Sequence, residues 1–114
     1  MSKHRKHIPN VVQIGGQLVY VINVDETEDE GFASSSLATG EIHIADVVCK
    51  NFKQSPYSKI NSYYHELIHL ILNNMGYGDT LSSDEKFVCA FAGFLTEAMV
   101  TAEFADEITD VEFE

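Results

Sequence analysis

The chain has 114 residues, of which 45% are hydrophobic and 11% aromatic, and this composition predicts one globular domain rather than a disordered or fibrous chain. Its formal net charge is −11 at pH 7 with only 7 basic side chains, which argues against a nucleic-acid partner because phosphate binding needs a basic face. No apolar run reaches the roughly 18 residues of a membrane span, so we expect no membrane segment and no membrane partner.

The two ends of the chain differ in composition from its middle. Residues 1–9 are polar and basic, which predicts a flexible leader without the apolar core of a signal peptide. Residues 105–114 are acidic, and we expect a disordered tail there. The sequence between them, residues 10–104, shows no internal repeat and is predicted to fold as a single domain.

Two β-hairpins are predicted in the first half of that domain. Residues 11–24 read as two β-branched strands joined by a Gly-Gly pair, which allows the positive φ angles of a tight turn. Residues 32–46 read as a second hairpin broken at a Thr-Gly pair. In its second strand the alternating pattern places Ile42 and Ile44 on the inner face and His43 on the opposite face.

Two helices are predicted in the second half, after a polar connection. Ser55 and a following proline are typical of a helix start, and no helix breaker occurs until a glycine pair, so a helix is predicted over residues 56–75. A second helix is predicted to begin at Ser82 or Ser83. Three large residues repeat there at the helical period and are expected to pack in the core: Phe87, Phe91 and Leu95. The predicted class is α+β, with a small, mostly antiparallel sheet followed by two helices.

The two cysteines, Cys49 and Cys89, lack both CxxC spacing and the density of a secreted disulfide framework. We therefore expect both to be reduced and to behave as small hydrophobic residues, in a cytoplasmic protein.

The first predicted helix contains the pattern HExxH at residues 65–69. Positions four apart lie on one helix face, so His65 and His69 can direct imidazole nitrogens at one point, as zinc ligands do. Glu66 is rotated about 100° around the helix axis, beside the expected metal, where its carboxylate can accept a proton from water. The alternative is a core helix that holds three ionisable groups without a metal, at a cost of several kcal/mol.

A third metal ligand is needed for a catalytic site, and no histidine follows His69. The metzincin pattern HExxHxxGxxH is excluded, because Leu72 replaces its glycine and Met75 replaces its last histidine. Small metal-dependent ribonucleases whose motif has three histidines are disfavoured for the same reason. A carboxylate is therefore expected to complete the set.

Two acidic residues at the start of the second helix are candidates for this ligand. Glu85 aligns with a stripe that would allow close helix packing: Val88, Cys89, Ala92 and Gly93. Asp84 aligns instead with the row of large residues, so Glu85 is the favoured ligand and Asp84 the alternative. A third possibility is a capping box in which Glu85 bonds back to the amide of Ser82 without touching a metal.

These residues resemble a known group of proteins. The sequence HELIHLILNNMGY at 65–77, followed by DEKFVCAFAGFL at 84–95 and preceded by the strand TGEIHI at 39–44, is similar to the small HExxH proteins encoded by phages and prophages, and more distantly to the ImmA/IrrE group of zinc metallopeptidases. The likeness covers roughly residues 11–100. It implies a minimal zincin-like fold, in which an active-site helix and the next helix carry the metal ligands.

The resemblance also implies roles for individual residues. His65 and His69 match the zinc ligands, Glu66 the general base, and Glu85 the glutamate ligand that defines a gluzincin. Because zincins bind substrate as an added strand beside the strand before the active-site helix, residues 41–46 are the corresponding expectation here.

Two functions follow as competing expectations. The first is a zinc-dependent metallopeptidase, a hydrolase that cleaves a peptide or protein substrate with Zn²⁺ as its cofactor. The second is a non-catalytic phage-derived accessory or interaction protein that keeps a zincin scaffold with a structural metal. A metal-free α+β domain is the third and simplest reading.

Overall fold

The computed structural model describes residues 7–103 of the chain. The predicted tail and most of the predicted leader lie outside the described residues. Its strands are β1 (Val11–Ile14), β2 (Gln17–Val24), β3 (Ala33–Ser36), β4 (Glu41–Ala45), β5 (Val47–Val48) and β6 (Phe52–Lys53). Its helices are α1 (Pro56–Asn74), the short 3₁₀ helix η1 (Leu81–Ser83) and α2 (Glu85–Thr101). No helix in this part of the chain is long and apolar enough to cross a membrane.

The main sheet has the strand order β1-β2-β4-β3. Both predicted hairpins are present, with β1 antiparallel to β2 and β3 antiparallel to β4, whereas β2 and β4 pair in parallel. Gly15 and Gly16 form the first turn with φ angles of +58° and +84°, which side chains with a Cβ rarely adopt. The predicted α+β class with a mostly antiparallel sheet is therefore confirmed.

The strand order corrects one expectation about substrate binding. Residues 41–46 were expected to offer a free strand edge, but β4 is hydrogen-bonded on both sides, to β2 and to β3. An interior strand has no unpaired backbone groups left to bind an added strand. The edge strand of this half of the sheet is β3, the strand whose sequence is Ala-Ser-Ser-Ser.

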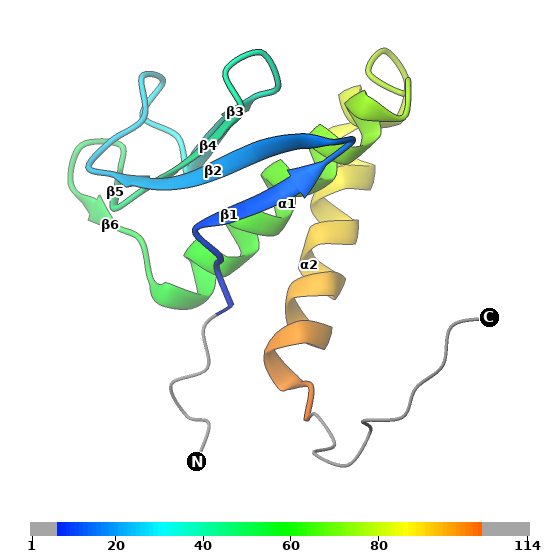
Figure 1. Cartoon of the computed structure of the whole chain (residues 1–114). Helices are drawn as coiled ribbons and strands as arrows, with labels where there is room; N and C mark the ends of the chain where they lie inside the picture. The colour runs from blue at the N-terminus through cyan, green and yellow to red at the C-terminus, as the bar shows by residue number, and fades with distance from the viewer. Residues whose placement is uncertain (1–6, 104–114) are drawn as a thin grey trace.

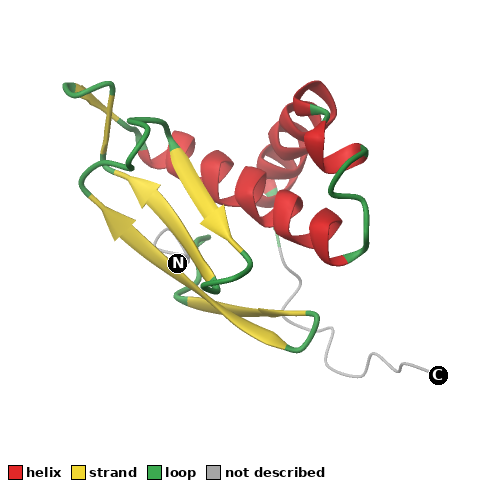
Figure 2. Ribbon diagram, turned by 90° about the horizontal axis from the view of Figure 1, so that it is seen from above, coloured by secondary structure: helices red, strands yellow, loops and turns green. Residues whose placement is uncertain are grey.

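Helix α1 lies between the sheet and α2, as Figures 1 and 2 show from two directions. It begins where predicted, because the Ser55 hydroxyl accepts a hydrogen bond from the Ser58 amide at 3.1 Å and proline occupies the first turn. It ends at Met75, before Gly76 with a φ of +93°. On the sheet side the core includes the predicted inner-face residues Ile42 and Ile44, both buried.

Helix α2 packs on α1 through a narrow stripe. Val88, Ala92 and Thr96 are fully buried. Two residues of the predicted stripe, Val88 and Ala92, therefore lie in the contact, whereas Cys89 and Gly93 are exposed and do not. The expectation that Phe91 belongs to the core is wrong, since it is 47% exposed, and Phe87 is only partly buried. The row of large residues lies beside the contact rather than in it, because the closest line of approach selects the smallest side chains.

Two short stretches differ from the sequence prediction. The connection before α1 contains a small hairpin, β5 and β6, and the Lys59 ammonium on α1 donates to the Asp46 carboxylate at its start. The second helix begins at Glu85 rather than at Ser82 or Ser83, because the serines belong to η1.

Cys49 and Cys89 are free thiols as expected, but both are exposed and neither is a core residue.

Candidate metal centre

The two histidines of α1 and one glutamate of α2 converge on one point. The Nε2 atoms of His65 and His69 lie 3.2 Å apart. The carboxylate of Glu85 spans both rings, with Oε1 at 3.3 Å from Nε2 of His65 and Oε2 at 3.1 Å from Nε2 of His69. In a tetrahedral zinc site with bonds of about 2.0 to 2.1 Å, ligand atoms lie about 3.3 Å from one another. Both the spacing and the donor types therefore fit zinc.

The start of α2 brings Glu85 to the histidines. Asp84 is the N-cap residue of α2, and its carboxylate accepts a hydrogen bond from the Phe87 amide at 3.1 Å. Glu85 is then the first helical residue and faces α1. The capping box does not form, because the Ser82 amide donates to the Tyr77 carbonyl instead. Of the two acidic candidates, the structure brings Glu85 and not Asp84 to the histidine pair.

A buried hydroxyl orients the second histidine. The Nδ1 atom of His69 lies 3.0 Å from Oγ of Ser82, a buried residue of η1. When this hydroxyl accepts a hydrogen bond from Nδ1–H, the lone pair of the neutral ring is on Nε2, the atom that faces His65 and Glu85. The sequence predicts Ser82 only as a residue at the start of a helix. Its role here depends on the chain path between the helices, which no local pattern indicates.

Cys89 is a site residue that the sequence analysis missed. Its Sγ atom lies 3.9 Å from Nδ1 of His65 and 4.0 Å from Oε1 of Glu85. The three side chains form a group that could hold a metal ion, with ligand atoms within 4.8 Å of one another. The signal was available in the sequence, because Cys89 follows Glu85 by four residues and therefore shares its helix face.

Glu66 points from α1 towards the edge of the sheet. Ser35 on β3 donates a hydrogen bond of 2.6 Å to Oε1 of Glu66. This bond holds one carboxylate oxygen and leaves Oε2 for proton transfer. Ser35 and Glu66 are 31 residues apart, so the pairing could not be foreseen from spacing.

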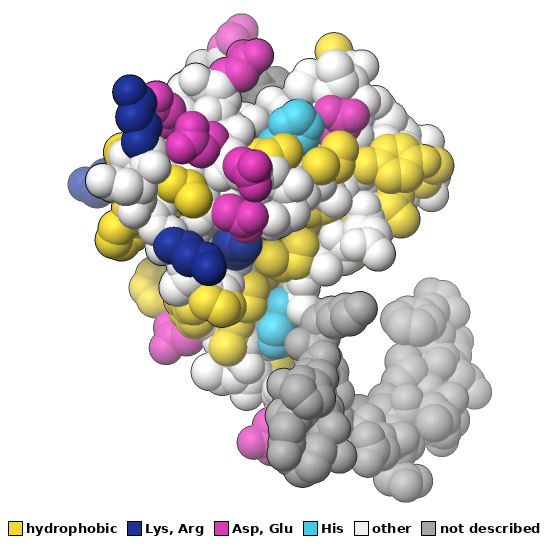
Figure 3. Space-filling view, turned by 90° about the vertical axis from the view of Figure 1, so that its left-hand side faces the viewer, with side chains coloured by type: hydrophobic (Ala, Val, Ile, Leu, Met, Phe, Trp, Pro, Cys, Tyr) yellow, Lys and Arg dark blue, Asp and Glu magenta, His cyan; other side chains and the backbone are white. Residues whose placement is uncertain are grey.

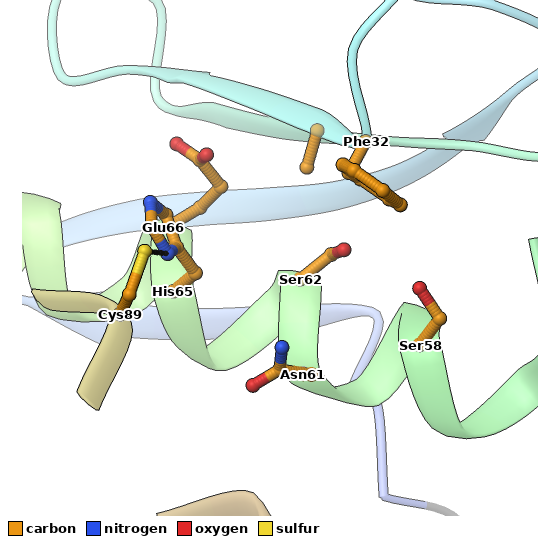
Figure 4. A pocket seen from close by; sticks show the side chains of 8 residues that line it. Phe32, Ser58, Asn61, Ser62, His65, Glu66 and Cys89 are labelled. Carbon is orange, nitrogen blue, oxygen red and sulfur yellow. Dashed lines mark hydrogen bonds between the residues drawn. The ribbon is translucent and has the colours of Figure 1, made fainter. Parts of the chain in front are cut away.

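A cavity of about 390 Å³ extends from this cluster along α1. Figure 4 shows His65, Glu66 and Cys89 at one end, Ser62 and Asn61 further along the helix, and Phe32 across from them. Apart from the site residues themselves, the lining carries no charged side chain. The cavity therefore suits a neutral ligand segment that combines apolar and hydrogen-bonding groups.

The tyrosines near the motif do not supply a donor to this cavity. Burial, together with the neighbouring Tyr64, raises the pKa of Tyr63 to about 12, and burial also raises the pKa of Tyr64. Tyr57 and Tyr77 are exposed, and none of these four residues lines the cavity.

The charge on the face of the molecule in Figure 3 is mixed. Acidic side chains gather on the upper part of this face, with lysine side chains beside and below them. This face has no continuous basic surface that a polyanion could follow.

In comparisons with known proteins, no family model, no curated protein and no solved structure matches the chain.

Proposed function

We propose that the protein is a zinc-dependent peptidase with a zincin-like fold, in which His65, His69 and Glu85 hold the metal. The observation that supports this most is the convergence of two imidazole nitrogens and one carboxylate, with N–N and N–O distances of 3.1 to 3.3 Å, from two helices that are otherwise held together by small side chains. The resemblance of the HExxH region to small phage and prophage metallopeptidases agrees with it. When bound there, zinc would lower the pKa of a water molecule and polarise a substrate carbonyl.

The general base in this proposal is Glu66. It follows His65 directly on α1, and its carboxylate lies at the mouth of the cavity rather than among the ligands. Ser35 fixes the orientation of the carboxylate through Oε1, so that Oε2 can accept a proton from water and pass it to the leaving amine.

A peptide is the substrate class that the edge strand and the cavity beside Glu66 favour. Strand β3 is an edge strand with an unpaired side, and it is tied to α1 by the contact between Ser35 and Glu66. An extended peptide added to that edge would run past Glu66 and could place one side chain in the cavity. The uncharged lining, which includes Phe32 and Asn61, favours a neutral side chain there and gives no support for a phosphate-bearing substrate.

The decisive measurement combines metal content with activity. Protein purified without chelator should contain one zinc per chain and should cleave unstructured peptides. Glu66→Gln should retain zinc and lose about 10²- to 10⁴-fold in kcat, because only the proton acceptor is removed. Glu28→Gln, the same substitution at an exposed glutamate outside the cluster, is the control. Cleavage that persists in Glu66→Gln, or wild-type protein that folds fully and binds no metal, would refute the proposal.

A second candidate function rests on Cys89. Its sulfur forms with His65 and Glu85 a group that could hold a metal ion and that does not include His69. If Cys89 bound the metal together with the two histidines and Glu85, the site would be closed by four protein ligands, which is typical of structural rather than catalytic sites. The protein would then be a non-catalytic accessory or interaction protein on a zincin scaffold. Cys89→Ala separates the two candidates: a peptidase keeps its zinc and its activity, whereas a structural site loses affinity. Cys49→Ala, at the other exposed free thiol, is the control.

A further inference from the structure

Much of the exposed surface of α2 is apolar, including Phe91 and Phe94, and it is uncovered in the described part of the chain. In 17 residues the helix carries three charged side chains, Glu85, Lys86 and Glu97. Yet only Val88, Ala92 and Thr96 on it are buried. A helix that is apolar on nearly all sides is normally enclosed by other protein, so a surface of this kind indicates an interaction site.

Four residues define the centre of this outer face: Lys86, Ala90, Gly93 and Glu97. Their spacings of four, three and four residues place them on one line along the helix, and all four are exposed. A Cβ built on Gly93 would meet no atom within 4 Å, so Gly93 faces open space and the middle of the line carries no large side chain. Phe94 stands beside it and is 72% exposed.

The arrangement of this face is self-complementary. If two copies of α2 pack antiparallel about a two-fold axis, the axis that places Lys86 opposite the partner's Glu97 also places Ala90 opposite the partner's Gly93. Both pairs are symmetric about the same point, between Phe91 and Ala92. Small residues would then meet at the crossing, where close approach is needed, and each Phe94 would face the partner's Cys89. Each end would gain one ion pair.

We infer that α2 forms the interface of a homodimer, in which this face binds the same face of a second copy. A contact between identical surfaces requires each group to meet its complement about one axis, and the charges of Lys86 and Glu97 and the small residues Ala90 and Gly93 satisfy this condition. An unrelated partner would not require the charges and the small residues to share one centre of symmetry. The inference does not depend on a metal or on peptidase activity.

Charge reversal tests this interface through the oligomeric state. Sedimentation velocity of the full chain over a range of concentrations should show a dimer for the wild type. Lys86→Glu alone and Glu97→Lys alone each create two like-charge contacts and should weaken the dimer about tenfold or more. An equimolar mixture of the two single variants should dimerise again, because every contact then joins opposite charges. The double variant should also dimerise.

Two results would overturn the inference: a wild type that stays monomeric at every concentration, or single variants that associate as the wild type does. A mixture that remains monomeric would overturn it as well. Phe94→Ser should weaken the dimer, whereas Phe52→Ser, at a phenylalanine that is 64% exposed elsewhere, should not. Circular dichroism of each variant establishes that it is folded before its association is interpreted.

Discussion

The Ser82 hydroxyl has a positioning role that can be separated from folding. Because Oγ of Ser82 lies 3.0 Å from Nδ1 of His69, Ser82→Ala removes the group that holds the ring and fixes its tautomer. We expect zinc affinity to fall about 10- to 100-fold, as for other partners of metal-binding histidines. Competition with a chromophoric chelator measures this. Ser83→Ala is the matched control, since that hydroxyl donates to the Thr80 carbonyl at the surface. Equal affinities in the two variants would show that Ser82 does not orient the ring.

At the scale of single residues, the sequence predicts contacts within one helix and misses those between segments. His65 and His69 could be placed together because the helix period fixes their spacing. Glu85 could be proposed but not chosen with certainty over Asp84, since the choice depends on where α2 begins. Ser35 could not be found, because its hydrogen bond to Glu66 joins two elements 31 residues apart. The tertiary path, not local pattern, decides such contacts.

At the scale of elements, the start of α2 can be tested through its cap. Asp84→Ala removes the acceptor for the Phe87 amide and should lower the free energy of unfolding by about 1 kcal/mol. Asp84→Asn keeps an acceptor and should retain both stability and zinc. Urea denaturation and metal analysis measure the two properties, with Asp79→Ala in the exposed turn before η1 as the control. Loss of zinc in Asp84→Asn would instead identify Asp84 as a metal ligand.

The ion pair between Asp46, which lies between β4 and β5, and Lys59 on α1 should make stability depend on pH. Two hydrogen bonds lower the pKa of the Asp46 carboxyl: the one from Lys59 has the larger effect and the one from Asn23 the smaller. A lowered pKa stabilises the fold above the unfolded value of about 4, and the contribution disappears as pH falls through the lower folded value. Asp46→Asn should therefore have a lower thermal midpoint than the wild type at pH 7 and the same midpoint near pH 2. Asp25→Asn is the control, and an equal difference at both pH values would contradict the assignment.

The elements themselves were more predictable than their arrangement. The hairpins and α1 follow from short-range signals, such as the Gly-Gly turn and the Ser-Pro helix start. The parallel pairing of β2 with β4 has no such signal, because the strand inserted between them in sequence, β3, goes to the outer edge of the sheet. Because β3 takes the edge position, residues 41–46 lie in the interior of the sheet, although the sequence predicts a free edge there. The hairpin of β5 and β6 was missed because its strands have two residues each.

At the scale of the whole molecule, a metal at this site would add a link between α1 and α2, a helix whose main contacts are with α1 and η1 rather than with the sheet. Helix α2 rests on α1 through Val88, Ala92 and Thr96, whereas α1 also packs on the sheet. We therefore expect zinc to stabilise the protein, by about 2.7 kcal/mol at a free concentration 100 times the dissociation constant.

We expect this stabilisation to be concentrated in α2. Local opening is easiest where buried contact is least, so zinc should slow amide hydrogen exchange in α2 more than in β2 and β4. Exchange followed by mass spectrometry, with zinc or with chelator, measures the difference. Glu85→Gln should abolish it by removing the ligand contributed by α2, whereas Glu28→Gln should not. If zinc slowed exchange throughout the chain to the same degree, the metal would be stabilising global folding and not the attachment of α2 to α1.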